Sequence, residues 1–465
     1  MGRYVSQEWC GNPHALRARD RRGGRFDAYI PHPLAEWQPL MPADVVAFLS
    51  ETERVLVDTA HRLKPRSGGD ICFWAESLGS SHIEGVAPNP KRVVRALAKR
   101  EHTGEGDSHG SVAEVIGNID ATAQAQQMLA RRQDLRLRTL LDAHRTLMAA
   151  SPTPHLGGVV RSDQNWIGGN DWHPLESEFV PPPPEMCLPL LEDLIVYLRG
   201  DGHPPLLQSA IAHAQFETIH PFGDGNGRAG RAVLYGVLKQ RCAPDGMMPP
   251  VSLALSRNRD AYLGALEEFQ TYVGEAAHPG RSEALVRWLE VLADAVHRSS
   301  AAAVRYQDAI ATLQDHWRAA VGGRRRRSVA ASIIDHLPAN PSVTAKTLAE
   351  ATGFSEGRCG DALRRMEVAG VVKSRSAGRA LRVYDADKVF EAFDVMSSTV
   401  CDYSASSSDY APVLADPLLA GGDSDALRAD SSLALCPRRV RSTGLPCGLA
   451  RHHQGHCRHL PHRKT

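Results

Sequence analysis

Twelve consecutive residues combine the groups that transfer of a phosphoryl or nucleotidyl group requires. The stretch His220-Pro-Phe-Gly-Asp-Gly-Asn-Gly-Arg-Ala-Gly-Arg231 supplies a side chain that is basic near pH 7, a carboxylate and two guanidinium groups. Gly223, Gly225 and Gly227 let backbone N–H groups curl inward ahead of a helix, which makes an anion site. The Asp224 carboxylate suits a phosphate-bound Mg²⁺. Together these groups predict phosphoryl or nucleotidyl transfer.

Two apolar segments with helical spacing flank this stretch, at residues 206–219 and 229–239. Arg228 and Arg231 are three residues apart, so they project from one face of the first helical turn. Taken singly, a histidine, a Gly-x-Gly-x-Gly turn and an arginine pair are more often structural. Their occurrence together between two helices favours a catalytic site.

The stretch resembles the Fic-family signature His-Pro-Phe-x-Asp/Glu-Gly-Asn-Gly-Arg-x-x-Arg, and every fixed position is met. The resemblance covers residues 28–275 and implies transfer of AMP from ATP, with Mg²⁺ or Mn²⁺, to a Ser, Thr or Tyr hydroxyl of a protein. It implies that His220 is the general base and that Asp224 holds the metal. The remaining residues that it implies for nucleotide binding are Gly225, Asn226, Gly227, Arg228, Gly230, Arg231 and, at the adenine side, Tyr262. Leu263 departs from the family's second tyrosine there.

A second motif lies upstream, in the stretch Ser80-Ser-His-Ile-Glu84-Gly85. Ser80 and Glu84 are four residues apart on one predicted helix face, and Gly85 is placed to end the helix. The pattern alone is typical of a surface helix with a glycine cap. The Fic resemblance instead implies an inhibitory motif, in which Glu84 pairs with Arg231 and keeps it from the γ-phosphate of ATP.

Glycines bracket a β-prone segment at residues 157–169, which predicts a hairpin. The Fic resemblance identifies it as the flap that holds the target peptide by strand addition. A core position is the alternative for Trp166, but the glycine brackets favour an exposed hairpin. The residues that the resemblance places on the flap are Arg161, Asn165, Trp166, Ile167 and Gly168.

A glycine pair and an arginine run at residues 322–327 mark a boundary, after which the pattern changes. Helices at residues 329–337, 344–352 and 355–369, with strands at 370–373 and 381–384, predict a winged helix-turn-helix. DNA binding and protein binding are equally favoured for it. The side chains that would meet phosphates are Arg358, Arg364, Arg365, Arg375 and Arg379.

From Ser397 onward the sequence lacks periodicity, which predicts a disordered tail. Near the end of the tail, Cys436, Cys447, His453 and Cys457 have spacings that allow a tetrahedral Zn²⁺ site. A histidine-rich tail with incidental cysteines is the alternative.

Composition limits the function classes. The net charge is +1 over 465 residues, so no global field favours nucleic acid or membranes. The sequence lacks both a signal peptide and an apolar run of the ~20 residues that span a bilayer, and its cysteines suit a reducing compartment, so we expect a cytoplasmic protein without a membrane partner. Whether it forms a homodimer is left open.

These features predict a mainly α chain: a Fic-type helical core with a β-hairpin flap, a winged helix-turn-helix domain and a disordered tail. The expected parts are a flexible N-terminus (1–27), an N-terminal Fic segment with the inhibitory helix (28–110), the Fic core (111–275), a helical linker (276–322), the winged helix (323–396) and the tail (397–465).

Three alternatives to AMP transfer stay open. A kinase-like Fic chemistry is one, although that branch typically has Lys where this chain has Gly227. Removal of AMP from a modified protein is another, with Glu84 positioning a water. The third is a DNA-binding regulator that uses the Fic core as a regulatory module.

Overall fold

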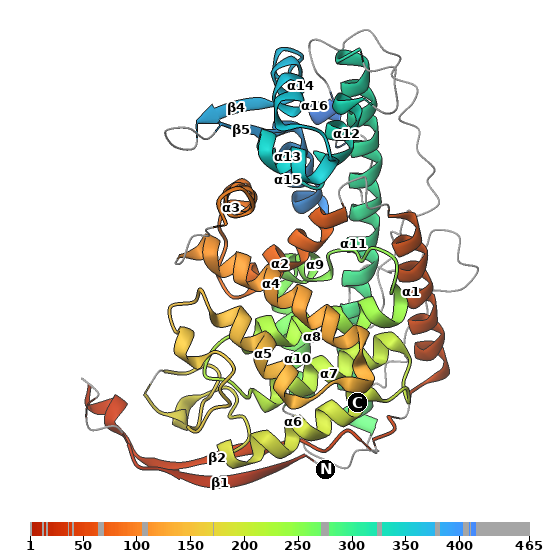
Figure 1. Cartoon of the computed structure of the whole chain (residues 1–465). Helices are drawn as coiled ribbons and strands as arrows, with labels where there is room; N and C mark the ends of the chain where they lie inside the picture. The colour runs from red at the N-terminus through yellow and green to blue at the C-terminus, as the bar shows by residue number, and fades with distance from the viewer. Residues whose placement is uncertain are drawn as a thin grey trace. The chain divides into compact units, whose positions relative to one another are not determined.

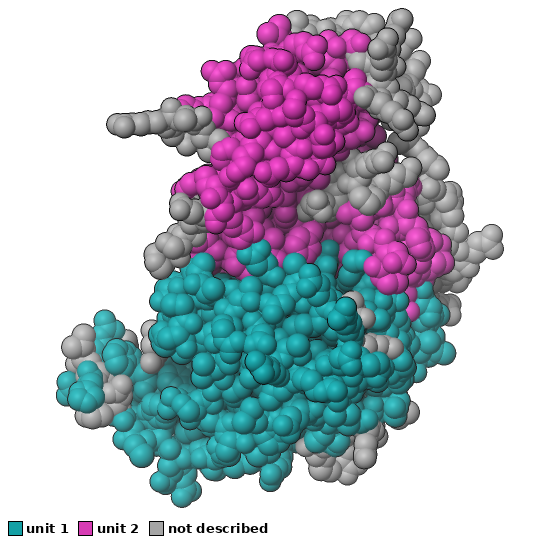
Figure 2. Space-filling view, viewed as in Figure 1, with its two compact units in different colours: residues 1–50, 120–241, 259–292 teal, residues 51–119, 242–258, 293–465 magenta. Residues whose placement is uncertain are grey.

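The chain is mainly α-helical, as predicted, with two small antiparallel sheets (Figure 1). The computed structural model describes residues 2–11, 14, 17–35, 37–39, 41–63, 69–104, 110–170, 172–270, 279–322, 328–376, 382–402, 409 and 411–414. These residues divide into two compact units (Figure 2). Unit 1 comprises residues 1–50, 120–241 and 259–292, and unit 2 comprises residues 51–119, 242–258 and 293–465.

Unit 1 is built around α7 (Pro205–Ile219), in which every residue from Leu206 to Ile219 is buried. A helix that is buried on all sides must be covered by other helices, and α6 (Pro184–Arg199) and α10 (Arg259–Gln270) pack against it. The unit also contains α5 (Leu137–Met148), α8 (Asn226–Cys242) and most of α4 (Ser111–Ala130), besides short 3₁₀ turns at Arg132–Asp134, Pro154–Leu156 and Pro174–Glu176.

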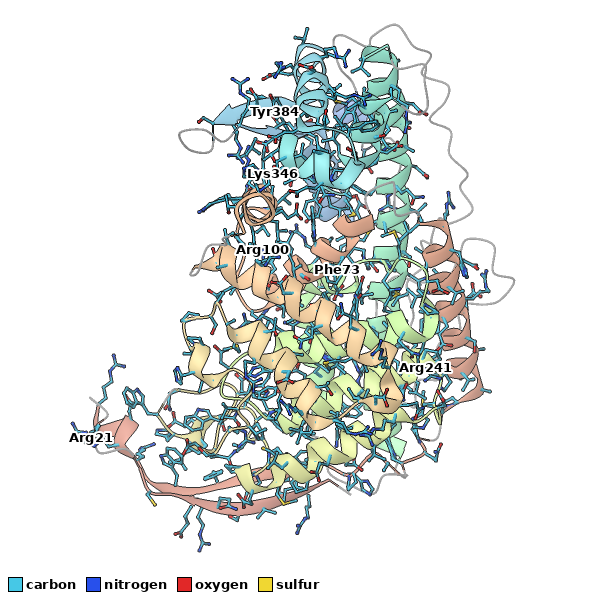
Figure 3. All side chains as sticks on the ribbon, viewed as in Figure 1. Arg21, Phe73, Arg100, Arg241, Lys346 and Tyr384 are labelled. Carbon is cyan, nitrogen blue, oxygen red and sulfur yellow. The ribbon has the colours of Figure 1, made fainter. Side chains whose placement is uncertain are left out.

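The loop between α6 and α7 is fastened by the end of α8. Arg241 donates one hydrogen bond to the His203 carbonyl oxygen at 2.7 Å and another to Gln208 Oε1 at 2.8 Å (Figure 3). This contact ties the start of α7 to the far end of the helix that follows the predicted catalytic stretch.

The N-terminal residues form a hairpin, so the prediction of a flexible segment at 1–27 was wrong. Strand β1 (Arg3–Trp9) pairs antiparallel with β2 (Gly24–Ile30) over seven residue pairs, with a 3₁₀ turn at Ala18–Arg21 between them. Phe26 and Ala28 alternate with polar residues on β2 and bury one face of the hairpin with Val180. That alternation is the sequence signal for the strand, and the arginine-rich composition obscured it.

Unit 2 contains α2 (Gly69–Ile83), α3 (Pro90–Thr103), α9 (Val251–Arg257) and most of α1 (Ala43–Arg62). Helices α2 and α9 pack closely, because Gly79 has no side chain. Buried Glu76 accepts hydrogen bonds from the Ser252 N–H, at 2.7 Å, and from the Ser252 hydroxyl. This pairing satisfies an N–H at the start of α9, where a carboxylate is favoured.

The segment predicted as a helical linker is a core element instead. Helix α11 (Pro279–Ala320) is 42 residues long and contributes to both units. Its Trp288 is fully buried in unit 1 and its Ile310 is fully buried in unit 2. A linker would expose such side chains to water.

The C-terminal part of unit 2 contains three helices in the predicted order and a sheet of three strands, one more than the two predicted. The helices are α12 (Val329–His336), α13 (Ala345–Thr352) and α14 (Glu356–Val368). The sheet has the order β3–β5–β4, with β3 (Ser342–Val343), β4 (Lys373–Ser376) and β5 (Arg382–Asp385) all antiparallel. Two further helices follow, α15 (Asp387–Thr399) and α16 (Ala411–Leu414), so the tail predicted to be disordered from Ser397 begins inside a helix.

Helix α3 fastens this C-terminal part to the rest of unit 2. Arg95 donates to Asp385, Lys91 pairs with Asp387, and Lys346 Nζ donates to the His102 carbonyl oxygen at 3.0 Å (Figure 3). Burial opposes ionisation of Asp385, but hydrogen bonds from Arg95 and Ser342 and the charge of Arg375 outweigh burial and lower its pKa. The contact is therefore an ionic network rather than a flexible tether.

Gly79 offers a test of the α2–α9 packing. A Cβ at this position would lie 2.4 Å from the Leu253 nitrogen and 2.5 Å from its Cα, whereas a Cβ at Gly264, on α10, would meet nothing within 4 Å. We expect Gly79→Ala to destabilise the protein by about 1–3 kcal/mol or more, because backbone must move. Gly264→Ala is the matched control and should be neutral or stabilising by up to about 1 kcal/mol. Equal thermal midpoints for the two variants would contradict the packing described.

Candidate active site

His220 ends α7 in a left-handed backbone conformation, with φ 46° and ψ 59°. It is the only non-glycine residue with positive φ in the described ranges. The conformation costs roughly 1–2 kcal/mol for a residue with a side chain, and helices usually end this way on glycine. The fold therefore holds histidine here against a local preference, which is common at functional sites.

The imidazole of His220 is oriented by the last turn of its own helix. Its Nδ1 lies 3.3 Å from the Glu217 carbonyl oxygen, and its side chain is 21% exposed. A carbonyl can only accept a hydrogen bond, so Nδ1 carries the proton and Nε2 is the basic nitrogen. This tautomer suits a general base.

The loop after His220 is closed by the first residue of α8. The Asn226 side chain accepts from the Phe222 N–H and donates to the Phe222 carbonyl oxygen, both at 2.9 Å. Phe222 is fully buried and forms a one-residue β-bridge with Val160. In this structure Asn226 shapes the loop, and its predicted contact with nucleotide stays a prediction.

His144, on α5, supports the same loop from the other side. Its ring stacks on Phe222 with a centroid distance of 3.5 Å and an interplanar angle of 4°. The Gly158 N–H donates to its Nδ1 at 2.9 Å, so its Nε2–H donates to the Asp224 carbonyl oxygen, also at 2.9 Å. Burial, with a smaller contribution from the charge of Arg228, lowers the pKa of His144 to about 4. Only the neutral imidazole can accept the hydrogen bond from Gly158 and donate the one to Asp224.

Asp224 presents a carboxylate that is ordered and accessible. Its side chain is 45% exposed, and it accepts from the Thr153 hydroxyl at 3.1 Å and from the Gly225 N–H at 2.6 Å. Arg228 lies 3.7 Å away. An oriented, partly exposed carboxylate fits a hard cation such as Mg²⁺ that brings its remaining ligands with it as water and phosphate. No signal in the sequence pointed to Thr153.

Arg228 and Arg231 are both buried on α8 and concentrate positive charge at its start. Arg231 Nη1 donates to the Tyr262 hydroxyl at 3.3 Å, and that hydroxyl lies 2.8 Å from His213 Nε2. Burial, and then the charge of Arg231, lowers the pKa of His213 to about 3, so His213 adds no positive charge. Tyr262 is only 1% exposed, and its place beside adenine stays a prediction.

Gly230 permits the close approach of α7 and α8. A Cβ there would lie 2.4 Å from Glu217 Oε1 and 3.1 Å from His213 Nδ1. Gly225, with φ +79°, is needed for the turn and would place a Cβ 2.8 Å from Met148 Sδ. Gly230 therefore has a packing role here; its predicted nucleotide contact is untested.

The predicted flap is not a regular hairpin. Within residues 157–169, Val160 bridges Phe222 and Ile167 bridges Phe179, each as a single β-bridge, while Gly168 takes φ +74°. The segment pairs with two different partners instead of with itself. Trp166 is half-buried against Trp9, at 5.4 Å between ring centroids, so it is neither a core residue nor an exposed one.

Two predicted flap residues contact the predicted catalytic stretch. Arg161 donates to the carbonyl oxygens of His220, Ile219, Pro182 and Asp163. The Asn165 amide donates to the carbonyl oxygens of His220, at 3.2 Å, and Phe222, at 3.1 Å. The sequence pattern predicted that Arg161 and Asn165 lie near the site, but it did not predict that they bind these backbone carbonyls.

The predicted inhibitory residues lie in unit 2. Helix α2 ends at Ile83, so Glu84 lies in the following turn and not on the helix, and Gly85 takes φ +80°. Glu84 is exposed, whereas Ser80 is buried. The pairing of Glu84 with Arg231, a residue of unit 1, stays a prediction.

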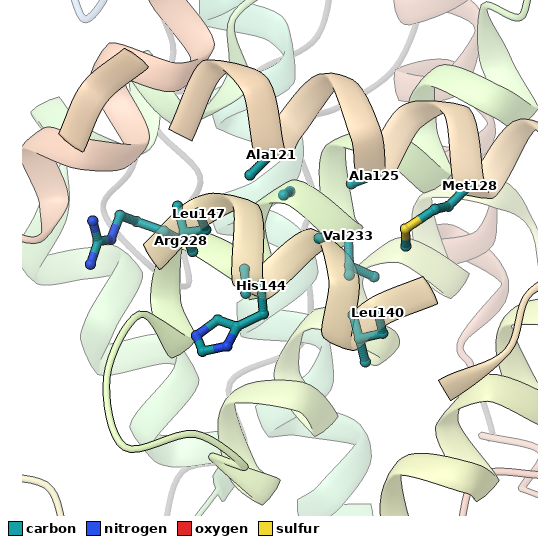
Figure 4. Close-up of a pocket in the computed structure, with 11 residues that line it drawn as sticks. Ala121, Ala125, Met128, Leu140, His144, Leu147, Arg228 and Val233 are labelled. Atoms are coloured by element: carbon teal, nitrogen blue, oxygen red, sulfur yellow. The ribbon is translucent and has the colours of Figure 1, made fainter. Parts of the chain in front are cut away.

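A small apolar pocket lies among α4, α5 and α8 (Figure 4). Ala125, Met128, Leu140 and Val233 line it, and the Arg228 guanidinium reaches away from them (Figure 4). An apolar lining does not suit a triphosphate, so we do not assign nucleotide to this pocket.

The described residues contain neither a metal-binding cluster nor a membrane-spanning helix. Across those residues, no three His, Cys, Asp or Glu side chains gather into a metal-binding group, and Cys436, Cys447, His453 and Cys457 lie outside them. No helix in the described ranges has the length and apolarity needed to cross a membrane.

Comparison with known proteins places the site in a family. Residues 134–238 match the Fic/DOC family, a range that includes the flap and His220–Arg231 but not Ser80–Gly85. A probable protein adenylyltransferase of Aquifex aeolicus (strain VF5) is 38% identical over 93 residues, which are 20% of this chain and 27% of that protein. Protein adenylyltransferase fic-1 of Caenorhabditis elegans is 28% identical over 196 residues, 39% of this chain and 34% of that protein.

Among solved structures, a Fic family protein from Desulfovibrio desulfuricans G20 is similar with a TM-score of 0.44 and 22% identity, over 75% of this chain and 98% of that chain. The chain spans about a third or less of the length of the two adenylyltransferases from Aquifex aeolicus and Caenorhabditis elegans.

The neutral state of His144 predicts a specific pH dependence. Its pKa is about 4 when folded and about 6.5 when unfolded, so the unfolded chain binds more protons between these values. The stability that neutral His144 contributes is complete above pH 6.5. As pH falls from there towards 4, the free energy of unfolding decreases by up to about 1.4 kcal/mol per pH unit. We expect His144→Gln to lose less stability than wild type between pH 7.5 and 5.0 in urea unfolding.

The control for this measurement is His61→Gln, which removes an exposed histidine at the end of α1 and should follow the wild-type pH dependence. Parallel curves for wild type and His144→Gln would show that His144 is not held neutral.

Proposed function

Because the chain is a Fic-family protein, we propose that it is a protein adenylyltransferase that moves AMP from ATP to a hydroxyl of a target protein or of itself. The observation that carries the proposal is the left-handed His220, whose Nε2 is the basic nitrogen and whose loop leads into the Asp224 carboxylate and the buried Arg228 and Arg231 at the start of α8. The named activity of the relatives supports the same chemistry.

In this proposal the target hydroxyl loses its proton to His220 Nε2 as its oxygen attacks the α-phosphorus of ATP. The bond from that phosphorus to the bridging oxygen breaks, and pyrophosphate leaves. Asp224 would hold Mg²⁺, which when bound neutralises phosphate charge. Arg228 and Arg231 would offset the charge on the β- and γ-phosphates, and the backbone N–H groups of Gly225 and Gly227 would complete the anion site.

The charge distribution of the C-terminal part favours a protein partner over DNA. Arg375 is engaged by Asp385, and Arg364 pairs with Asp361. Arg358 lies over the Phe354 ring, and Glu356 and Asp361 add negative charge to the exposed face of α14. Arginines that are already neutralised release few counterions on DNA. Arg379 lies outside the described residues.

The general base can be tested by His220→Ala. We expect transfer of α-labelled phosphate from ATP to fall about 10²–10⁴-fold, because a positioned base contributes that much. His61→Ala, which removes an exposed histidine of α1, should retain wild-type transfer. Undiminished transfer by a folded His220→Ala protein would remove the base assignment, and transfer of γ-label instead of α-label would indicate a kinase.

Autoinhibition predicts that Glu84→Gly raises transfer. If Glu84 pairs with Arg231, its removal should increase self- or target modification about 10- to 100-fold, which is the range of a partly buried ion pair. Adding Arg231→Ala should cancel the gain, and Glu101→Gly, at an exposed position near the end of α3, should produce none.

An unchanged rate for Glu84→Gly at saturating Mg-ATP would make Glu84 an ordinary turn residue. Loss of an AMP-removing activity in the same variant would assign the reverse reaction instead.

A further inference from the structure

The backbone of His220 needs support that its own helix does not supply. Its left-handed conformation turns its carbonyl away from the α7 hydrogen-bond ladder, at the point where helical carbonyls are left without intrahelical partners. The described contacts of this carbonyl oxygen come from two side chains, Arg161 Nε at 2.9 Å and Asn165 Nδ2 at 3.2 Å.

Arg161 is bound in an unusual way for an arginine. It is 8% exposed, and its guanidinium donates to four carbonyl oxygens: His220 at 2.9 Å, Asp163 at 3.1 Å, Pro182 at 2.5 Å and Ile219 at 3.4 Å. The hydrogen bonds described for its guanidinium all go to backbone carbonyl oxygens and none to a carboxylate. Two of the four acceptors are the end of α7, where the helix dipole favours a cation.

Arg161 also joins three segments that are distant in sequence. Its acceptors belong to the flap, to the proline run before α6 and to the end of α7, and its own N–H donates to the Pro221 carbonyl oxygen at 2.9 Å. A planar group with five donors can hold all of these carbonyls in one arrangement, which an ammonium group cannot. All three nitrogens of the guanidinium donate to these carbonyls and the residue is 8% exposed, so little of the group is left for a target peptide.

We propose that Arg161 is a positioning residue for His220, with Asn165 as a second support on the same carbonyl. The inference rests on the proposed function, because it gives His220 the role of base. By fixing the carbonyl of His220, Arg161 holds the left-handed turn and so the direction in which Nε2 points. This assignment replaces the target-binding role that the family resemblance implied for both residues.

The role predicts a separation of kinetic constants. A misdirected base lowers kcat while substrates still bind, and a misplacement of about 1 Å can cost up to about 10²-fold. In the Glu84→Gly background, we expect Arg161→Lys to lower kcat for AMP transfer about 10- to 100-fold. The KM values for Mg-ATP and for the protein target should change less than about threefold, since uniform binding is retained.

Arg199→Lys is the matched control. Arg199, at the end of α6 in unit 1, also donates to a backbone carbonyl, that of Leu135 at 2.8 Å from Nε, and its described hydrogen bonds do not involve residues 220–231. Its kcat should equal that of the parent. If Arg161→Lys instead raises the target KM at unchanged kcat, Arg161 binds the target and the proposal is wrong.

Two further measurements keep the test decisive. Asn165→Ala removes only the second donor, so it should lower kcat less than Arg161→Lys, and it replaces that variant if Arg161→Lys does not fold. In ¹⁵N-histidine spectra, the signal lost in His220→Gln should shift in Arg161→Lys or Asn165→Ala. An unshifted His220 signal overturns the positioning proposal, whether or not the Glu84→Gly parent transfers AMP. If the signal shifts but the parent transfers no AMP, only the proposed function is rejected.

Discussion

The left-handed turn at His220 is the constraint on which the rest of the candidate site depends. It ends α7 and reverses the chain within one residue, so the loop folds back and α8 begins at Asn226, six residues later. Because histidine is costly in this conformation, the surroundings must favour it. They do so by burying Phe222 against His144 and by bonding the turn's carbonyl to Arg161. The groups that hold the turn are thus the groups that shape the site.

Besides its arginines, the site holds the carboxyl groups of Asp224 and Glu217, while its buried histidines are neutral. His144 and His213 both have lowered pKa values, chiefly because of burial and also because of the neighbouring Arg228 and Arg231 respectively. If either histidine were protonated, it would add like charge beside a guanidinium, and His144 would also lose the hydrogen bond that it accepts from the Gly158 N–H. The neutral state at physiological pH is therefore what allows two arginines to be buried close to one loop. A site of this kind complements an anion such as a phosphate.

The segment that carries Glu84 shares its unit with the C-terminal helices and sheet. Helix α3 follows the Glu84 turn and contributes Val93 and Leu97 to a cluster with α4, while its charged side meets the C-terminal part at Asp385. Helix α3 is thus packed on two sides within unit 2, and exposed residues such as Arg92 and Lys99 lie between them. The three helices and the sheet thus have a structural role in the unit.

The sequence by itself determined the helical class, the stretch His220–Arg231 that lies within the family match, and the order of the three C-terminal helices. These follow from local rules: helical spacing of apolar residues, glycines at the loop, and side-chain types within twelve residues. Tertiary structure alone decided that Arg161 bonds carbonyls of the α7 end, that His144 is neutral, and that Gly79 is a contact point. It also decided that residues 279–320 form a core helix instead of a linker. Hydrogen-bond partners, desolvation and close packing depend on residues far apart in the chain, and no local pattern encodes which of them will meet.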